Sequence, residues 1–200
     1  MNAFQWPSAL HLNAPDIEVD RRRLLELLLE HSYIKQDVTL SSGRKSDFYV
    51  DCKKTTLLAE GHWLAGRLLF SAIHAAHPEA VAVGGLTMGA DPLASAVSLV
   101  SYLAGVPLDA FLIRKRSKGY GTDRWIEGLP SVTAGARVII VEDVVTTGSA
   151  TMTAIERAQA AGLMPVAAFA LVDRGEGGCE AIASVGVRLY SLFTREDFSE

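Results

Sequence analysis

Residues 138–150 read Val-Ile-Ile-Val-Glu-Asp-Val-Val-Thr-Thr-Gly-Ser-Ala. The unbroken β-branched run at the start is typical of a strand buried on both faces, as in a parallel sheet. Two adjacent carboxylates, Glu142 and Asp143, follow at the carboxyl end of that strand. A short turn of hydroxyl residues and one glycine then leads into an alanine-rich helical pattern from Ala150 to Ala161. This order predicts a ligand site where a parallel strand passes into a helix.

The turn and the acidic pair suit different parts of a ligand. Backbone N–H groups of the loop and of the first helical turn can enclose an anion, and the helix dipole favours negative charge there. Gly148 permits a positive φ, and the neighbouring hydroxyls add donors. The acidic pair would repel a phosphate but suits sugar hydroxyls or a cation, so a ribose 5-phosphate fits both halves. The alternative is a buried strand followed by a capped turn that binds no ligand, but in such a turn the two acids would gain nothing structurally. No Gly-Lys-Ser/Thr follows a glycine-rich loop, which argues against an ordinary nucleoside triphosphatase.

Composition narrows the class of protein. The chain has 200 residues, a net charge of −4 and two cysteines. This length suits one domain with a sizeable core, and the charge gives no global basic field for nucleic acid. No metal-ligand spacing surrounds Cys52 or Cys179, which favours plain thiols in a reducing compartment. The first 20 residues hold no cationic segment followed by an apolar run, and no apolar run reaches membrane-spanning length. We therefore expect a cytoplasmic protein without nucleic-acid or membrane partners.

The amino-terminal part is predicted to contain a tail, a helix and a hairpin. Residues 1–19 show no periodicity and are expected to be irregular. A helix is expected from Asp20, as its N-cap, through His31. Strands at 38–40 and 48–51 are expected to pair across a turn at 42–43.

The remaining pattern alternates strands with helices. Strands are expected near residues 81, 109, 138, 165 and 187, and helices over 59–76, 150–161 and 181–184. The glycine-rich residues after 83 are expected to be a loop with open backbone amides, and Asp91 and Pro92 to begin a helix that ends near Ala104. Thr194 is expected to cap a terminal turn. The alternation predicts an α/β fold, a doubly wound, mainly parallel five-stranded sheet flanked by helices.

A cationic loop follows the second of these strands. Residues 114–124 hold five basic residues and one acidic residue, and two glycines among them give the backbone freedom. Such a run is often a solvated surface. A loop of this length between two strands is otherwise a lid or a disordered segment, and here it lies in a sheet that carries a predicted anion site.

Four segments, taken together, resemble a known family. Residues 138–150 closely resemble the phosphoribosyl-diphosphate (PRPP) motif of type I phosphoribosyltransferases. Residues 39–49, Thr-Leu-Ser-Ser-Gly-Arg-Lys-Ser-Asp-Phe-Tyr, are similar to the amino-terminal hood of orotate phosphoribosyltransferases. Residues 114–121 resemble the catalytic loop of those enzymes, and Arg174 stands where they bind the base. The resemblance covers about residues 20–195. It implies one phosphoribosyltransferase domain over 20–200, with the hood at about 20–55 and the core at about 56–195.

The resemblance implies an activity and its partners. Members transfer ribose 5-phosphate from PRPP to orotate, giving orotidine 5′-monophosphate and diphosphate in pyrimidine nucleotide synthesis. It implies Mg²⁺ as cofactor, held mainly by the substrate and near Asp143. It also implies a homodimer in which each mobile loop covers the neighbour's site. In this family the glycine-rich loop near residues 84–89 contacts the diphosphate and can hold a non-proline cis peptide bond.

The resemblance also implies roles for individual residues. The catalytic residues would be Lys118, Glu142 and Asp143. The residues that would bind PRPP are Arg114, Lys115, Lys118, Tyr120, Glu142, Asp143, Val144, Val145, Thr146, Thr147, Gly148, Ser149 and Ala150. The residues that would bind orotate are Phe48, Tyr49, Thr146 and Arg174.

Four residues depart from the family pattern. Ser41 and Thr87-Met88 stand where some members have Lys and Tyr-Lys, and Tyr120 replaces a histidine. We expect these changes to affect PRPP affinity more than the type of reaction, with Arg44 or Lys45 as compensating cations.

Two rival functions stay open. One rival is a PRPP-sensing regulator that binds RNA or a partner protein, which would need neither Arg174 nor the cationic loop. The other is a transferase for a different base, although purine enzymes are expected to lack this hood.

Overall fold

A mixed six-stranded sheet forms the centre of the molecule. The computed structural model describes residues 14–34, 38–39, 45–46, 48–116, 125–128 and 134–199. The strand order is β10-β9-β8-β5-β6-β7. The strands are β5 (Ala82–Leu86), β6 (Asp109–Ile113), β7 (Ile126–Gly128), β8 (Arg137–Val145), β9 (Met164–Asp173) and β10 (Arg188–Thr194). The five parallel strands are those predicted, so the mainly parallel, doubly wound sheet is confirmed. The sequence did not predict β7, which pairs antiparallel with β6.

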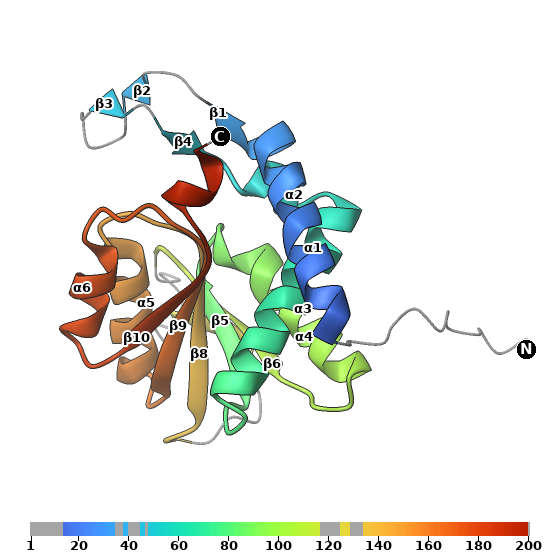
Figure 1. Cartoon of the computed structure of the whole chain (residues 1–200). Coiled ribbons are helices and arrows are strands. Elements are labelled where there is room, and N and C mark those ends of the chain that lie inside the picture. The colour runs from blue at the N-terminus through green and yellow to red at the C-terminus, as the bar shows by residue number, and fades with distance from the viewer. Residues whose placement is uncertain are drawn as a thin grey trace, which may run out of the picture.

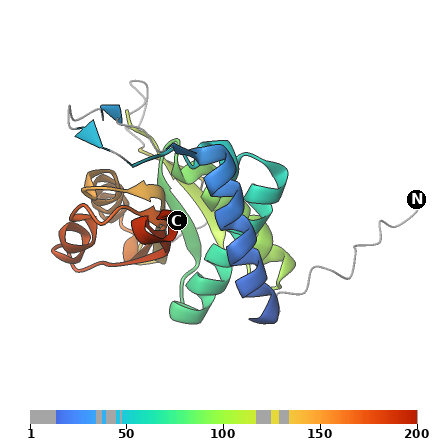
Figure 2. The same cartoon turned by 45° about the horizontal axis from the view of Figure 1, so that its top comes forward.

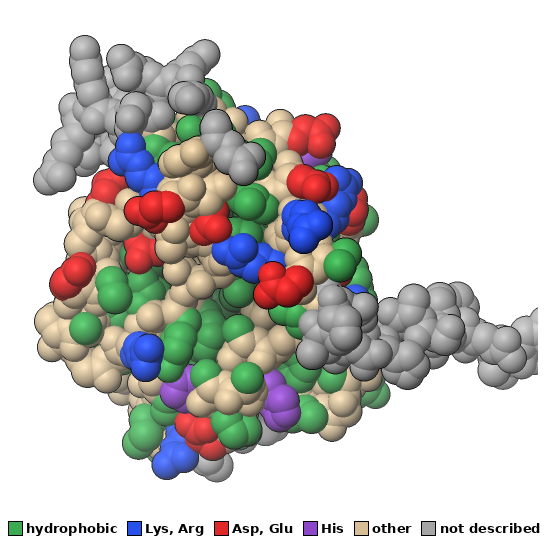
Figure 3. All heavy atoms as spheres, viewed as in Figure 1, with side chains coloured by type: hydrophobic (Ala, Val, Ile, Leu, Met, Phe, Trp, Pro, Cys, Tyr) green, Lys and Arg blue, Asp and Glu red, His purple; other side chains and the backbone are tan. Residues whose placement is uncertain are grey.

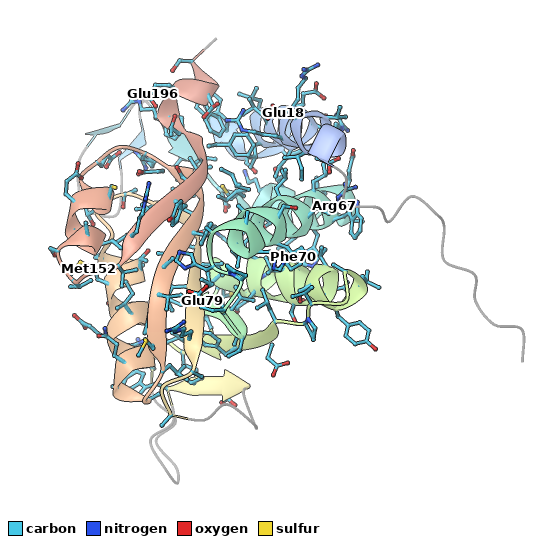
Figure 4. All side chains as sticks on the ribbon, turned by 60° about the horizontal axis from the view of Figure 1, so that its bottom comes forward. Glu18, Arg67, Phe70, Glu79, Met152 and Glu196 are labelled. Atoms are coloured by element: carbon cyan, nitrogen blue, oxygen red, sulfur yellow. The ribbon has the colours of Figure 1, made fainter. Side chains whose placement is uncertain are left out.

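Helices cover both faces of the sheet (Figure 1). On one face lie α3 (Ala59–Ala76) and α4 (Ala90–Leu103), with α1 (Ala14–Leu27) packed against α3. On the other lie α5 (Ser149–Ala160) and α6 (Gly178–Ala183). Alternate residues of β8 enter the two cores: Ile139 packs with the α3 and α4 side, and Ile140 packs with the α5 side. Figure 4 shows Phe70 of α3 and Met152 of α5 on opposite sides of the sheet. Burial on both faces explains the unbroken β-branched run.

The strand order changes direction between β5 and β8. Strand β5 pairs with β6 on one side and with β8 on the other. The helices that follow β5 and β8, α4 and α5, lie on opposite faces, so their amino ends diverge. A crevice at the carboxyl ends of these two strands is the usual ligand site of such sheets.

The glycines of β5 correct the prediction of an open loop. Gly84 and Gly85 lie inside the strand, paired with Phe111 and Leu112 of β6. A Cβ on Gly84 would lie 2.2 Å from the carbonyl oxygen of Phe111, and one on Gly85 would lie 2.1 Å from that of Val141. These glycines therefore serve close packing between strands and not anion binding. The loop after β5 is therefore shorter than the predicted one and begins at Thr87.

The amino-terminal helix begins earlier than predicted. Helix α1 starts at Ala14, so residues 14–19 are helical, and residues 1–13 of the predicted tail lie outside the described residues. Pro15 fits the first helical turn because no N–H is needed there. Asp20 is not the N-cap but forms an ion pair with Arg67 of α3, at 3.1 Å between Oδ2 and Nε. A five-residue π-helix, η2 (Leu28–Ser32), completes the segment.

The hood pairs differently from the predicted hairpin. Strand β2 (Val38–Thr39) pairs with β3 (Lys45–Ser46), while β4 (Tyr49–Val50) pairs with β1 (Tyr33–Ile34). The predicted second strand is therefore real but has another partner, and the turn at 42–43 lies outside the described residues. The short helix α2 (Lys53–Thr56) joins β4 to α3. Figures 1 and 2 show the hood at the end of the sheet where the parallel strands end.

The chain end closes against the hood. After β10 a 3₁₀ helix, η3 (Arg195–Phe198), brings Phe198 to 5.3 Å from Phe48, measured between ring centres. The predicted cap at Thr194 is confirmed by a capping box: the Thr194 side chain accepts a hydrogen bond from the backbone N–H of Asp197, and Asp197 Oδ2 accepts one from Thr194 N at 2.7 Å. Within the described residues, no helix has both the length and the apolar character that crossing a membrane requires.

Candidate active site

A pocket of about 370 Å³ lies at the carboxyl ends of β5 and β8. Its lining comes from five segments: Lys53, Leu86, Thr87, Met88, Gly89, Lys115, Glu142, Asp143 and Ala150. Charged side chains of both signs gather in the upper half of the face seen in Figure 3, at the end of the sheet where the hood lies. The predicted acidic pair thus reaches the crevice that the strand order creates.

The acidic pair is buried and its two carboxylates influence each other. Glu142 and Asp143 are 7% and 8% exposed, and both lie within β8, which continues to Val145 and does not end before the acids. Asp143 Oδ1 accepts a hydrogen bond from the N–H of Val144 at 2.9 Å. Burial, and then the charge of Asp143, raise the pKa of Glu142 well above its ordinary value. Two buried acids at one strand end cost stability, which is typical of a site that needs them for function.

The loop after β8 has the geometry that the sequence predicted. Gly148 has φ of +79° and precedes α5, whose first backbone hydrogen bond runs from Met152 N to Gly148 O at 2.8 Å. The N–H groups of Ser149 and Ala150 precede that bond, in the first turn, where helices bind anions. Thr146 is half-buried, and Thr147 and Ser149 are exposed.

Thr87, Met88 and Gly89 form the opposite wall of the pocket. The peptide bond between Thr87 and Met88 is cis, as the family resemblance allowed. A Cβ on Gly89 would lie 2.3 Å from Asp143 Oδ1. Glycine at this position therefore lets the loop approach the carboxylate.

Lys53 is a site residue that sequence reasoning missed. Its ammonium lies 2.7 Å from Asp51 Oδ1 and 3.4 Å from Asp143 Oδ2. Burial lowers the pKa of Lys53, but its pairing with Asp51 and the charge of Asp143 outweigh burial, so the pKa is raised. In the sequence, nothing distinguishes Lys53 from the exposed Lys54 beside it.

Two of the predicted base-binding residues, Arg174 and Phe48, lie next to each other. Arg174 follows β9, is 5% exposed, and its Nη2 lies 2.7 Å from Glu176 Oε1. Its guanidinium carbon lies 5.5 Å from the ring centre of Phe48. Phe48 is buried, and Tyr49 is half-buried. The structure thus brings Arg174 to Phe48, although Arg174 does not line the pocket described above.

The two ends of the cationic loop are fixed together. Arg114 N donates to Trp125 O at 2.8 Å, and its side chain pairs with Glu127 at 2.7 Å. Arg157 of α5 donates to the carbonyl oxygen of Arg114, and its guanidinium lies 4.0 Å from the Trp125 ring centre. Lys115 lines the pocket. Lys118 and Tyr120 lie outside the described residues, as do Ser41, Arg44 and the side chain of Lys45.

The pocket offers hard oxygen ligands but no preformed metal cage. Within the described part of the chain, no group of three or more His, Cys, Asp or Glu side chains could hold a metal ion. The carboxylate oxygens of Asp143 fit Mg²⁺ chemically, so an ion there would take most ligands from a substrate.

Comparison with known proteins agrees with this site. Residues 62–185 match the family described as "Phosphoribosyl transferase domain". The chain, whose sheet carries this pocket with its acidic pair and hydroxyl-rich loop, thus contains a phosphoribosyltransferase domain.

Individual relatives narrow the class. The orotate phosphoribosyltransferase of Sorangium cellulosum is 48% identical over 179 residues, which cover 90% of this chain and 93% of that protein. The chain belongs to the orotate phosphoribosyltransferase family. The crystal structure of the Mycobacterium tuberculosis enzyme with Fe(III) dicitrate is 41% identical, has a TM-score of 0.78 and covers 90% of this chain and 99% of that one. A structure of the same enzyme with PRPP has a TM-score of 0.73 at 37% identity and the same coverage.

Proposed function

We propose that this chain transfers the ribose 5-phosphate group of PRPP to orotate, giving orotidine 5′-monophosphate and diphosphate. The step belongs to pyrimidine nucleotide synthesis. The observation that carries the proposal is the pocket in which Glu142 and Asp143 lie close to the first turn of α5. A ligand with an anionic end and a diol fits this pairing. The relatives named for this activity, one of them solved with PRPP, support it.

PRPP binds in two parts. The 5′-phosphate accepts hydrogen bonds from the N–H groups and hydroxyls of residues 144–150, and the positive end of α5 favours its charge. Glu142 and Asp143 accept hydrogen bonds from the ribose hydroxyls. This division keeps the phosphate away from the acidic pair.

The acidic pair also serves the chemical step. A bond forms between the orotate ring nitrogen and the anomeric carbon, while the bond from that carbon to diphosphate breaks and its electron pair leaves with diphosphate. The ring gains positive charge as the leaving group departs, and the charge of Asp143 stabilises it. No general base is required, because the orotate ring nitrogen can react as an anion.

Orotate binds beside Arg174. A guanidinium presents a planar fork that matches a carboxylate. Glu176 Oε1 lies 2.7 Å from that guanidinium, so a carboxylate can evidently be accommodated there. The carboxylate of orotate takes a similar position, with Phe48, Tyr49 and Thr146 around the base.

Cationic groups would serve the leaving group. A Mg²⁺ ion would be held mainly by the substrate, with Asp143 as the candidate protein ligand, and would supply positive charge to the diphosphate. Lys118, together with Arg114 and Lys115, stabilises the departing diphosphate when the loop closes.

The enzyme acts as a homodimer in which Lys118 serves the neighbouring site. The outer side of α4 and the turn after it expose apolar side chains, with Leu99 at 54% and Tyr102 at 72%, which suit an interface between two copies. A cytoplasmic location stays a prediction from the sequence.

The test is a spectrophotometric assay with the purified protein, PRPP and Mg²⁺. We expect orotate absorbance to fall with equivalent release of diphosphate, and no product with uracil or purine bases. A protein that binds PRPP but consumes no base would instead be a PRPP-sensing regulator. Turnover of a purine in place of orotate would show a transferase for a different base.

A further inference from the structure

A diphosphate bound in the pocket would lie near two acidic side chains and would need cations beside it. Glu142 and Asp143 both line it. Among the residues that the structure describes, the cations in its lining are Lys53 and Lys115. Lys115 is exposed at the root of the cationic loop, whereas Lys53 comes from the hood and contacts the acidic pair directly.

The backbone around Lys53 is held firmly. Cys52 and Thr55 are fully buried on either side of it. Thr55 Oγ1 lies 2.6 Å from Ser32 Oγ and donates to Leu27 O at 3.1 Å. Lys54 N donates to Asp51 O at 3.1 Å. Lys53 therefore projects toward the pocket from a rigid base, which keeps the entropy cost of ordering it low.

The ammonium of Lys53 has bonding capacity to spare. An ammonium carries three N–H donors. Two carboxylates, those of Asp51 and Asp143, lie within 3.4 Å of it. One donor is left for an anionic oxygen inside the pocket. Because Lys53 contacts Asp143, it lies beside the acids to which the proposed function assigns the ribose hydroxyls. A PRPP molecule with its 5′-phosphate on the first turn of α5 and its ribose on these acids would carry its diphosphate beyond the acids, within reach of Lys53.

We propose that Lys53 is a further substrate-binding residue that donates a hydrogen bond to the diphosphate of PRPP while Asp51 and Asp143 hold its ammonium in place. This inference rests on the proposed function only in taking PRPP as the ligand of the pocket, and it does not require transfer to orotate. It assigns to the hood a cation for the leaving group in addition to those of the cationic loop.

The test is direct binding to Lys53→Met by calorimetry with Mg²⁺ present, using PRPP, diphosphate and ribose 5-phosphate as separate ligands. Lys54→Met is the matched control, since Lys54 is the adjacent exposed lysine of the same short helix. Loss of one charged hydrogen bond predicts a weakening of about 10- to 100-fold for PRPP and for diphosphate. The affinity for ribose 5-phosphate should stay within about 3-fold of the wild-type value, because this ligand has no diphosphate and Lys53 can affect its binding only indirectly. Lys54→Met should match wild type for all three.

Two outcomes would overturn the inference. Unchanged PRPP affinity in folded Lys53→Met would show that the ammonium makes no contact with the ligand. An equal loss for ribose 5-phosphate would show that Lys53 acts only by holding Asp143 against the sugar. Should Lys53→Met not fold, Lys53→Gln provides the same comparison. Binding needs no turnover, so a wild-type protein that binds PRPP without consuming orotate would sink the proposed function and leave this inference standing.

Discussion

Replacing Asp143 by asparagine separates its catalytic charge from its structural role. The amide keeps the shape of the side chain, and its oxygen can still accept the hydrogen bond from Val144 N that Asp143 Oδ1 accepts at 2.9 Å. The substitution removes one charge that lies 3.4 Å from the ammonium of Lys53. It also removes the charge that, after burial, contributes to the raised pKa of Glu142.

These changes oppose each other in the free energy of folding. At 3.4 Å, an effective dielectric constant of about 20 gives an attraction of about 5 kcal/mol before screening. The Lys53 side chain is 38% exposed, so solvent reduces the measurable contribution to about 1 kcal/mol or less. Relief of repulsion with Glu142 offsets part of that loss. We therefore expect the melting temperature to change by no more than about 4 °C.

The effect on the reaction should be much larger. A well-placed electrostatic contact with the transition state is typically worth about 10²–10³ in turnover. The orotate assay and a thermal melt on the same preparation measure both quantities. Asp51→Asn serves as the comparison, because Asp51 contacts Lys53 but does not line the pocket. It should lose less activity than Asp143→Asn. Full activity in folded Asp143→Asn, or an equal loss in Asp51→Asn, would refute a direct role for the Asp143 charge.

Three further changes test other parts of the molecule. Arg174→Lys keeps the charge but loses the bidentate fork, so titration should show weaker orotate binding and unchanged PRPP binding; equal effects on both ligands would make Arg174 structural. Gly85→Ala should lower the free energy of unfolding in urea by about 3 kcal/mol, because its Cβ would lie 2.1 Å from Val141 O; a variant as stable as wild type would contradict this packing. Mixing inactive Lys118→Ala and Arg174→Ala proteins should restore about a quarter of wild-type activity. Random exchange makes about half of all dimers mixed, and each mixed dimer has one intact site of its two. No recovery after demonstrated subunit exchange would rule out a shared site.

The sheet could be predicted from the sequence because its signals are local. The helix at 59–76 has the predicted ends, the strand expected near residue 109 begins there, and the central run is buried on both faces as its residues indicated. Strand β7 escaped prediction because its three residues are too few for a periodic pattern. Its pairing also depends on two residues far apart in the chain, Arg114 and Trp125, which Arg157 brings together.

Residues with two common uses were harder to interpret. Gly84 and Gly85 were predicted to open a loop, but the backbones of β6 and β8 approach them so closely that no side chain fits. Residues 14–19 were predicted to be irregular, but they are helical, and Pro15 lies in the first turn of α1, where its missing N–H costs nothing. Asp20 looked like a helix cap because its ion-pair partner, Arg67, is 47 positions away in sequence. For the two glycines and for Asp20, a contact between distant segments decided between two local possibilities.

In the candidate site, too, some residues could be predicted from one continuous stretch of sequence, and others reach the site only through the fold. Glu142, Asp143 and the loop to Ala150 form one continuous stretch whose order carries a chemical meaning, so the sequence alone could place an anion beside a diol. Lys53 belongs to no such stretch, because it reaches the site only after the hood folds over the carboxyl ends of the strands. Its neighbour Lys54 has the same side chain and the same local sequence, but it is exposed and does not line the pocket. What distinguishes the two is the direction in which α2 presents each side chain, which is set by the burial of Cys52 and Thr55. A cation that contacts the acidic pair can therefore come from a segment with no recognisable motif, and only the folded arrangement shows which lysine it is.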